Sequence, residues 1–583
     1  MADHSPPSIS NLPQEVFEII TSNLSTRDLA HCVRVNRTWS DLFLPQLWKT
    51  IEIRDRTDYN RFNTHDTLKA LLRNCHSIQT LHTCNIKWIW ALASMTTRCR
   101  NLRSLTLVRD HNALSVSSEL VTLPPRDLEA SFARQAIYVS SALPILLKQN
   151  RGLQHVKIEG FIFHPRAGCR TLDYILRSLP TQSLDRLDIK CKSFLTSKSP
   201  ADDIDSAVFQ DGEDGDGQED DRPYALKELT LSGRIESSDA LVAFLERCPR
   251  LESLILRSVS DVTLDQLSAV LRKHCPLLSR LQWESENCIQ GDAEIANLLD
   301  ASSSDSGRGW KSIQLPFMLN FGPLSVQALL RHASTLTHVS ANGWGSIASS
   351  DIQTLLCSAP NLESLNGQLV VHSTNDGRVA EMVLRAQDIM HAHASWTGTS
   401  SLKHLRLMIH GVPRPDVKCD HKGRPFPHPL PEVTPSYSLQ VQERVCQQLG
   451  AMTQLQTLVL GRPDINPKGV IELAERLVRL HPTLGALVRE HQYQCLELSL
   501  ESGLGLMSEL KELRSLDVTR MAHRIGVAEL EWMHVNWPKL ETIQGLFSHR
   551  LWEGHGNSDW DGSEAVQDWM KAHPLGVGSS FYN

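Results

Sequence analysis

The chain has 583 residues, and its 59 basic and 66 acidic side chains give a formal net charge of −7 at pH 7. This balance argues against broad electrostatic capture of nucleic acid, which requires clustered lysine and arginine. Hydrophobic residues make up 41% of the chain, so we expect a large ordered core.

Cysteine usage and hydropathy bear on the cellular compartment. The 13 cysteines form no short, evenly spaced framework, which predicts free thiols in a reducing compartment. Residues 1 to 25 include acidic side chains and lack the apolar centre of a secretory signal. The densest apolar run, from Trp88 to Ala93, is much shorter than the roughly 18 residues of a membrane helix. We therefore expect a protein of the cytoplasm, the nucleus or both, without a membrane partner.

The first 50 residues carry the start and stop signals of three short helices. These signals are Pro13 for the first helix, Ser25 with Asp28 for the second, and Asn36 with Pro45 for the third. Proline is tolerated at a helix start, serine and aspartate three residues apart form a capping box, and a later proline interrupts a helix. The sequence therefore predicts a small helical module.

The first predicted helix has more apolar residues than so small a module can bury. Val16, Ile19, Ile20 and Leu24 recur at helical spacing. About forty residues cannot enclose all these side chains in a core of their own. The remaining apolar face needs either the rest of the chain or a partner protein.

This segment resembles the F-box, the module that docks substrate receptors onto Skp1 in SCF-type cullin–RING ubiquitin ligases. The matching residues are Leu12, Pro13, Glu15, Val16, Ile19, Ile20, Leu24, Asp28, Leu29, Val33, Val35, Asn36, Arg37, Trp39, Pro45, Leu47 and Trp48. The resemblance places the F-box at residues 10 to 54, after a disordered stretch at residues 1 to 9. It implies that Trp48 packs toward the interior.

The resemblance also implies which side chains would contact Skp1. These are Leu12, Pro13, Glu15, Val16, Ile19, Leu24, Leu29, Val33 and Trp39. Through Skp1 the chain would join a cullin–RING ligase.

Beyond residue 60 an apolar pattern with the spacing L-x-x-L-x-L returns repeatedly. Its copies begin at Ile78, Leu102, Leu153, Leu184, Leu226, Leu251, Leu278, Trp310, Leu336, Leu362, Leu402, Leu455, Leu513 and Leu540. Within each copy the alternation predicts a short strand. Helices are expected between copies at 237–247, 264–274, 324–332 and 350–358. Each unit leaves an apolar edge that only its neighbour covers, which is typical of a solenoid.

The spacing of these copies resembles that of leucine-rich repeats, especially the irregular arrays of fungal F-box/leucine-rich-repeat proteins. Copies that begin at Leu226, Leu251 and Leu278 are 25 and 27 residues apart. The predicted fold class is α/β, with a helical F-box followed by a horseshoe-shaped leucine-rich-repeat solenoid over residues 60 to 550. An α/β domain with scattered strand–helix units is the alternative. Residues 551 to 583, with Trp552, Trp560 and Trp569, are expected to cap the solenoid or to form a tail.

Three insertions interrupt the predicted array. Residues 109 to 150 exceed one unit and include a helix near 128 to 147. Residues 196 to 224 hold ten acidic side chains, whose mutual repulsion predicts a disordered loop. Residues 410 to 437 hold seven prolines and predict an extended loop. Either of the last two could bind a partner, although a surface excursion is the simpler interpretation.

Catalytic and metal-binding patterns are absent from the sequence. Cys419 and His421, with His410 and His428 nearby, lack the paired spacings of structural zinc, and His391 and His393 are weaker candidates. The acidic run lacks the order of a calcium loop, and no phosphate-binding loop or nucleophile elbow occurs. We expect no metal, no cofactor and no catalytic residue.

Three hypotheses of function remain. The first is the substrate-recognition subunit of an SCF ubiquitin ligase, whose F-box binds Skp1 and whose repeats bind an unidentified target protein. The second is a Skp1-bound scaffold without a role in protein turnover. The third, an enzyme housed in the array, has no motif behind it. Sequence does not separate the first two.

A target would contact the strand residues that alternate with the buried leucines. The strongest candidates are Glu228, Thr230, Arg257, Arg280, Glu284, His404, Arg406 and Asp517. They are chosen from strand alternation and not from a recognition motif. Their charges are mixed, so they indicate neither a phosphopeptide pocket nor a nucleic-acid groove.

Overall fold

The computed structural model describes most of the chain, with gaps in several loops. The described residues are 12–53, 64–84, 86–94, 99–108, 142–161, 175–194, 222–235, 238–257, 263–284, 291–302, 308–315, 321–340, 347–367, 383–391, 395–415, 434–461, 494–519, 521–546 and 562–573. The chain divides into two compact units, Met1–Leu278 and Ser279–Asn583. Among the described residues, no helix is both long enough and apolar enough to cross a bilayer.

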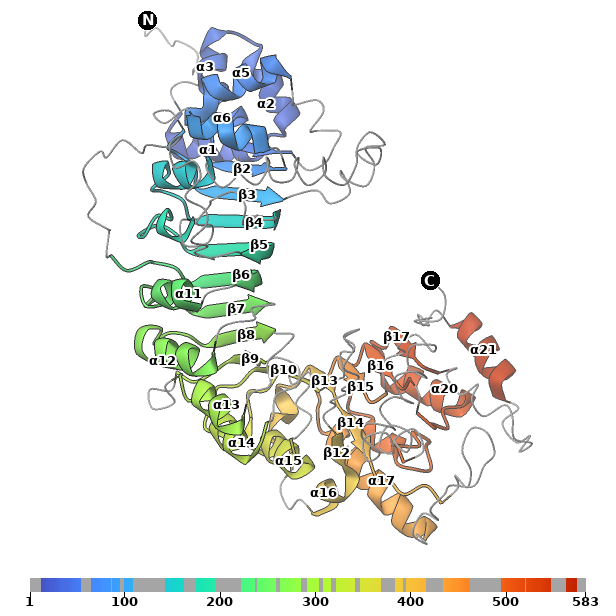
Figure 1. The fold of residues 1–583 in the computed structure, drawn as a ribbon. Helices are drawn as coiled ribbons and strands as arrows, with labels where there is room; N and C mark the ends of the chain where they lie inside the picture. Colours follow the sequence, from blue (N-terminus) through green and yellow to red (C-terminus); the bar gives the residue numbers. More distant parts are fainter. Residues whose placement is uncertain are drawn as a thin grey trace, which may run out of the picture. The chain divides into compact units, whose positions relative to one another are not determined.

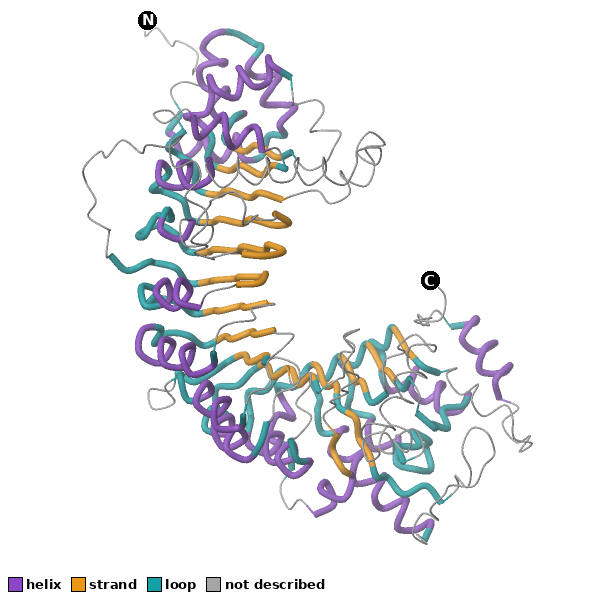
Figure 2. Tube along the Cα trace, in the orientation of Figure 1, coloured by secondary structure: helices purple, strands orange, loops and turns teal. Residues whose placement is uncertain are grey.

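The first unit is a helical module followed by a ladder of strands (Figure 1). Its elements are α1 (Gln14–Ser22), α2 (Thr26–Val33), α3 (Arg37–Leu47), β1 (Thr50–Glu52), α5 (His65–Asn74), η2 (Cys75–Ser77), β2 (Thr80–Thr83), α6 (Ile86–Ser94), β3 (Ser104–Val108), β4 (His155–Phe161), β5 (Arg186–Phe194), β6 (Glu228–Ile235), α11 (Ser238–Leu245), β7 (Ser253–Arg257) and α12 (Leu264–His274). Strands β1 to β7 pair in chain order and are all parallel. Figure 2 shows the helices that follow the strands along one side of this ladder.

The second unit continues the strand–helix alternation. Its elements are β8 (Arg280–Glu284), α13 (Asp292–Leu299), β9 (Ser312–Gln314), α14 (Pro323–Leu330), β10 (His338–Ser340), α15 (Ser349–Ser358), β11 (Ser364–Asn366), β12 (Val383–Arg385), α16 (Ala386–His391), η4 (Thr397–Ser400), β13 (His404–Arg406), β14 (Met408–His410), α17 (Pro435–Gly450), β15 (Thr457–Val459), η5 (Leu504–Met507), β16 (Ser515–Asp517), α20 (Val527–Asn536), β17 (Thr542–Gln544) and α21 (Gly562–Ala572). Strands β8, β9, β10, β11, β13, β15, β16 and β17 form its parallel ladder. Strands β12 and β14 form a separate parallel pair.

The predicted repeat pattern coincides with these strands. Every apolar copy from Ile78 to Leu540 carries a strand of the ladder, and its leading apolar side chain is buried. The middle leucines stack in register, as in Leu365↔Leu405 and Leu405↔Leu458. The predicted helices are confirmed at α11, α12, α14 and α15. The chain is thus a helical module followed by an α/β solenoid with parallel strands.

A repeated hydrogen-bond arrangement joins successive strands. The carbonyl of Lys311 accepts the amides of Thr337 and His338, at 2.8 and 3.0 Å. The carbonyl of Glu363 accepts those of Lys403 and His404 at the same two distances. Because parallel strands pair through evenly spaced bonds, this forked contact fixes the register at the start of each repeat.

Helix boundaries differ from the predictions at two prolines. Helix α3 does not end at Pro45 but continues to Leu47, and the amide of Trp48 closes it on the carbonyl of Leu44 at 3.1 Å. Pro45 lies in the last turn, so one lost hydrogen bond does not end the helix. The predicted loop at 410–437 is wrong at both ends, because His410 belongs to β14 and Pro435 is the first residue of α17. Thr434 caps α17, and proline is favoured directly after a cap.

Several predicted segments lie outside the described residues. They are residues 1–9, most of the insertion at 109–150, the acidic stretch at 196–221, and residues 416–433 of the proline-rich insertion. The positions Cys419, His421, His428, His393, Trp552 and Trp560 lie there too. Trp569 is described: it is buried in α21 and stacks on His573, with ring centroids 4.1 Å apart.

Candidate functional site

The outward side of α1 is an apolar surface. Leu12, Val16, Ile19 and Ile20 are all exposed, and Ile19 keeps 63% of its accessible area. At about 100° per residue the three helical positions Val16, Ile19 and Ile20 fall within one arc of about 100°, and Leu12 lies just before the helix. We call this set the α1 face. An apolar helix stripe on a small module normally packs against another element.

The inward side of α1 holds the helix on α3. Phe17 lies 5.2 Å from Phe43, measured between ring centroids, and Trp39 lies 5.3 Å from the same ring. Phe43 is fully buried and Thr21 is buried on the same side of α1. The α1 face is therefore directed away from the module by a packed aromatic core beneath it.

Two helix caps fix the geometry of this module. The Ser25 hydroxyl accepts the amide of Asp28 at 3.2 Å, and the Asp28 carboxylate accepts the amide of Ser25 at 3.1 Å. Hydrogen bonds from the Ser25 hydroxyl and amide lower the pKa of Asp28. The Asn36 side chain accepts the amide of Trp39 at 2.8 Å. Both predicted caps are confirmed, and they set where α2 and α3 begin.

The predicted Skp1-facing residues divide into three groups by exposure. The exposed ones are Leu12, Pro13, Glu15, Val16 and Ile19, and the half-buried ones are Leu24, Val33 and Trp39. Leu29 is only 8% exposed, so the expectation that it faces outward is wrong. Leu29 is the buried residue of α2 and packs within the helical module.

Two exposed apolar side chains were missed as candidates. Ile20 extends the α1 face, and Val35 is 59% exposed in the turn between α2 and α3. The signal for Val35 was its position in a short turn, since it follows the last residues of α2 and precedes the cap Asn36. A valine there has no helical neighbour to cover it.

The helical module joins the strands without a linker. Helix α3 ends at Leu47, and the carbonyl of Lys49 already accepts the amides of Gln79 and Thr80 at 2.9 and 3.0 Å. Strand β1 then pairs with β2, from Thr50↔Thr80 onward. The α1 face and the first strands therefore belong to one hydrogen-bonded structure.

The second candidate surface is the face of the strand ladder that carries the residues between the buried leucines. We call it the strand side. In the first unit it is rich in paired charges: Lys157 and Glu159 are 2.8 Å apart, and Lys190 and Asp188 are 3.5 Å apart. Of the predicted target contacts, Glu228, Thr230 and Arg257 lie here and are half-buried. Glu228 is paired with Arg186 at 3.5 Å.

In the second unit the same side carries few charges. One row runs Ser312, His338, Ser364, His404, Thr457, Ser515, Thr542, and the next runs Gln314, Ser340, Asn366, Arg406. Among the predicted contacts, Arg280, His404 and Arg406 are exposed and Glu284 is half-buried. The Glu284 carboxylate accepts hydrogen bonds from the side-chain amides of Gln282 and Gln314, at 2.7 and 3.1 Å.

Two titratable groups on this surface have shifted pKa values. Partial loss of solvent contact, followed by the positive charge of Arg406, lowers the pKa of His404. The hydrogen bond from Lys403, at 2.7 Å, lowers the pKa of Glu363. At neutral pH the surface thus offers a neutral imidazole between two cationic side chains.

Asp517 is not on the open surface. It is 8% exposed and accepts the amide of Thr519 at 2.8 Å, so the expectation that it faces a target is wrong. Thr519 packs against Gly461 and Gly545, where an added Cβ would meet its backbone at 2.3 and 2.2 Å. Burial raises the pKa of the Asp517 carboxyl.

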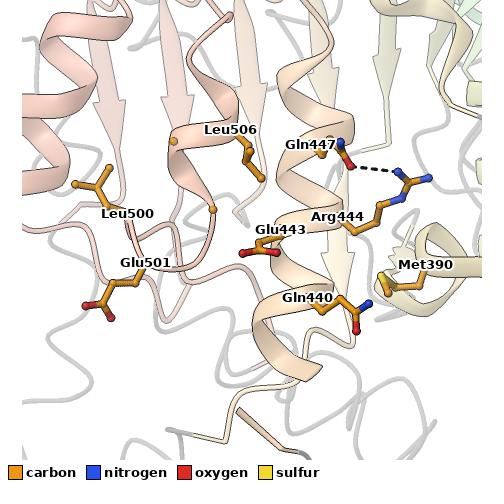
Figure 3. Close-up of a pocket in the computed structure, with 10 residues that line it drawn as sticks. Met390, Gln440, Glu443, Arg444, Gln447, Leu500, Glu501 and Leu506 are labelled. Atoms are coloured by element: carbon orange, nitrogen blue, oxygen red, sulfur yellow. Dashed lines mark hydrogen bonds between the residues drawn. The ribbon is translucent and has the colours of Figure 1, made fainter. Parts of the chain in front are cut away.

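A third surface feature is a groove between α16, α17 and η5 (Figure 3). Its volume is about 850 Å³. Apolar side chains from Met390, Leu500 and Leu506 line it together with Glu443 and Glu501. We call it the α17 groove.

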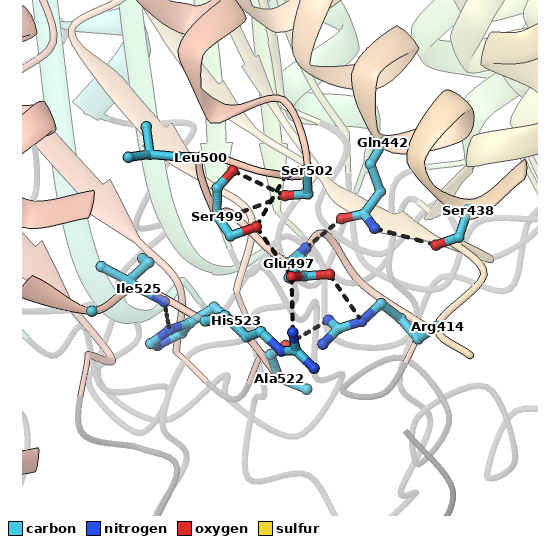
Figure 4. Close-up of polar contacts among 12 residues, drawn as sticks. Arg414, Ser438, Gln442, Glu497, Ser499, Leu500, Ser502, Ala522, His523 and Ile525 are labelled. Atoms are coloured by element: carbon cyan, nitrogen blue, oxygen red, sulfur yellow. Dashed lines mark hydrogen bonds and ion pairs between the residues drawn. The ribbon is translucent and has the colours of Figure 1, made fainter. Parts of the chain in front are cut away.

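A buried ionic cluster in the second unit ties irregular chain segments together (Figure 4). Arg414 is almost fully buried, 4.0 Å from the Glu497 carboxylate, and donates to the carbonyl of Ala522 at 2.6 Å. Arg524 approaches the same carboxylate at 3.5 Å. The Ser499 hydroxyl donates to Glu497 at 3.1 Å. Each member has a partner inside the protein, so the cluster serves structure.

Metal and thiol chemistry find no support in the described part of the chain. No group of three or more His, Cys, Asp or Glu side chains there could hold a metal ion. His410 is buried in β14, and His391 is exposed at the end of α16. Burial raises the pKa of Cys99, Cys275 and Cys446 to about 12, the opposite of an activated thiol.

Comparison with known proteins identifies the helical module. The family model described as F-box-like matches residues 9–54, so the chain carries an F-box-like domain at its N-terminal end. No curated protein is significantly similar to the chain. Among solved structures, the crystal structure of the Rad7 and Elc1 complex in yeast matches at 16% identity, with a TM-score of 0.28, over 62% of this chain and 89% of that one. This likeness is too weak to carry an argument.

Proposed function

We propose that this chain is the substrate-recognition subunit of an SCF-type ubiquitin ligase. The F-box-like domain would bind Skp1, and the solenoid would hold a target protein for ubiquitination by the rest of the complex. The single observation that carries the proposal is the exposed α1 face inside the segment that matches the F-box-like family. An exposed apolar surface of this kind marks a site of interaction with a partner.

The role of the chain in this proposal is proximity and not chemistry. Binding a target and Skp1 at once raises the local concentration of target lysines near the conjugating enzyme. The amides of Gln79 and Thr80 donate to the carbonyl of Lys49, so hydrogen bonds join the F-box-like domain directly to the first strands. This direct connection supports the role. The same proposal places the protein in the cytoplasm, the nucleus or both.

For the solenoid we propose membership of the leucine-rich-repeat class, with the strand side as the target-binding face. The support is the repeated strand carrying buried leucines, with spacings of 25 to 27 residues between the copies at Leu226, Leu251 and Leu278. Seven of the predicted contacts keep exposed or half-buried positions on this side: Glu228, Thr230, Arg257, Arg280, Glu284, His404 and Arg406.

The proposal is tested with Skp1 and the full chain expressed together. The double variant Val16→Asp/Ile19→Asp places carboxylates on the α1 face, where binding would bury them without partners. We expect Skp1 affinity to fall by at least about 100-fold, because unpaired buried charge is costly and apolar anchors dominate interfaces. Folding should be unaffected, since both side chains are exposed.

A matched control is Val535→Asp, which changes a valine of α20 that is 75% exposed. It should leave Skp1 binding unchanged. Skp1 that co-purifies equally with the double variant and the wild type would reject the proposed function.

A Skp1-bound scaffold is the second candidate, because Skp1 binding alone says nothing about turnover. The two are separated by comparing protein half-lives in cells that express the wild type or the Val16→Asp/Ile19→Asp variant. A substrate receptor requires at least one protein bound by the solenoid to persist longer with the variant. A scaffold predicts unchanged half-lives for every bound protein.

A further inference from the structure

The α17 groove has the properties of a further docking site, formed by other residues than the α1 face and the strand side. It lies in the second unit between the outer helices α16 and α17 and the turn η5. None of its residues belongs to the α1 face or to the strand side.

The groove has three apolar side chains among its polar ones. Leu500 and Leu506 keep 39% and 46% of their accessible area, and Met390 lines the groove from the opposite side of α17 (Figure 3). Single exposed leucines are ordinary on a protein surface, but apolar side chains gathered in one hollow indicate a binding site. Methionine and leucine adapt readily to the shape of an apolar partner.

The unmatched charge of the groove is negative. Among the described residues, neither Glu443 nor Glu501 has an ion-pair partner, and both side chains are exposed. Arg444, the one cation among the lining residues, donates to the side chain of Gln447 at 3.2 Å. A ligand with apolar side chains flanked by lysine or arginine would match the apolar side chains and the two glutamates, which we call the rim carboxylates.

The walls of the groove are already in place. Gly450 lets η5 pack directly on α17, since a Cβ there would meet the carbonyl oxygen of Leu506 at 2.1 Å. Gly503 adopts φ +104°, a conformation that glycine accepts without strain, and reaches the backbone of Glu443. A preformed site spares a ligand the cost of ordering it.

We propose that the α17 groove binds a short segment of a partner protein that carries two or three apolar side chains next to lysine or arginine. A volume of about 850 Å³ is enough for a few side chains of a peptide. Its lining residues Leu500 and Leu506 are exposed, so the groove is accessible to a peptide from solvent. This inference does not depend on Skp1 binding.

The test selects peptides from a random 12-residue display library on the full-length chain. We expect the enriched peptides to combine apolar residues with at least two lysines or arginines. Their affinity, measured by fluorescence anisotropy with a labelled peptide, should fall as salt increases, because the rim carboxylates are exposed.

Two changes to the groove separate its apolar and charged parts. Gly505→Tyr fills the groove, since an added Cβ at Gly505 meets no atom within 4 Å. Glu443→Lys/Glu501→Lys reverses the rim charge. Each should weaken peptide binding by roughly tenfold or more.

Matched controls exist for both changes. Gly152→Tyr alters a glycine with equally open surroundings in the first unit, and Glu531→Lys makes a similar charge change on α20. Both should bind the peptides like the wild type. The proposal is overturned if no peptide is enriched, if enriched peptides lack basic residues, or if the groove variants bind as well as the controls. Self-association that Gly505→Tyr abolishes, seen by sedimentation velocity, would also overturn it in favour of a second copy.

Discussion

The α1 face and the strand side of the second unit are exposed for different reasons. On α1, apolar side chains such as Val16 and Ile19 lie in water although the module has a packed aromatic core beneath them. On the strands, the apolar side chains are buried, and the positions between them carry polar side chains such as the half-buried Ser312 and Gln314 and the exposed His338. The first surface is incomplete without a partner, whereas the second is stable in water alone.

This difference explains why one surface points to a partner and the other does not. An uncovered apolar face has a cost in water, so its presence implies a protein that covers it. A polar strand side has no such cost and accommodates many ligands or none. If that side binds a target as proposed, specificity would come from a few side chains such as Arg406 and His404.

The largest expected effect tests the inside of the F-box-like domain against its surface. Leu29→Ala should lower the free energy of unfolding by about 2–5 kcal/mol, because the side chain is buried. Ile19→Ala should change it by no more than about 0.5 kcal/mol, because the side chain is exposed. Urea unfolding measures both. Equal losses for the two variants would mean that Ile19 is packed and that the α1 face does not exist.

Acid should destabilise the second unit through a buried histidine. Burial, helped by the charge of Arg385, lowers the pKa of His410 from 6.5 to about 4. Between those values the unfolded chain binds a proton that the folded one does not, so stability falls as pH drops from 6.5 to 4. The full loss is about 3 kcal/mol.

Urea midpoints measured across this pH range should show that slope, and His410→Gln should flatten it. Burial also lowers the pKa of His332, so part of the slope should remain in the variant. A slope that is the same with and without His410 would contradict its burial as a neutral imidazole.

Loss of a helix cap should have a smaller effect on the F-box-like domain. Ser25→Ala removes the hydroxyl that caps α2 and should lower the free energy of unfolding of the domain by about 1 kcal/mol. Thr26→Ala, one residue later and outside the cap, is the control. Skp1 affinity should change little in either variant if the α1 face alone carries it. A large loss of affinity in Ser25→Ala would extend the binding surface to the start of α2.

The smallest effect on stability is expected on the strand side. Arg406→Glu alters an exposed residue and should change the free energy of unfolding by no more than about 0.5 kcal/mol. It should weaken capture of a target while leaving Skp1 binding intact. Lys69→Glu, on an exposed position of α5, is the matched charge reversal. Target capture that is equal in both variants would move the binding face away from β13.

The repeat could be predicted from sequence because its cause is local. Each strand needs apolar residues at alternate positions, and each copy supplies them, so the ladder follows from the spacing of residues such as Leu405 and Leu458. Helix α12 likewise spans the predicted residues 264–274, and the structure shows that Thr263 caps its first turn. Strands β12 and β14 were not predicted, because they pair outside the repeat pattern.

Burial at particular positions could not be predicted in the same way. Strand alternation placed Asp517 outward, but it is buried and accepts the amide of Thr519, a residue that packs against Gly461 and Gly545 of the adjoining repeats. Family resemblance placed Leu29 outward, but contacts within the helical module bury it. The α17 groove depends on Gly450 and Leu506, which are 56 residues apart, so no local pattern contains it. These features arise from contacts between segments distant in sequence.

Hydrogen exchange of the full chain, with and without Skp1, tests the central claim most directly. The account predicts slower amide exchange over residues 12–24 and around Val35 when Skp1 is present, and unchanged exchange in strands β8 to β17. Protection confined to the strands, or no protection of α1 at saturating Skp1, would contradict the claim that the α1 face is the surface this partner covers.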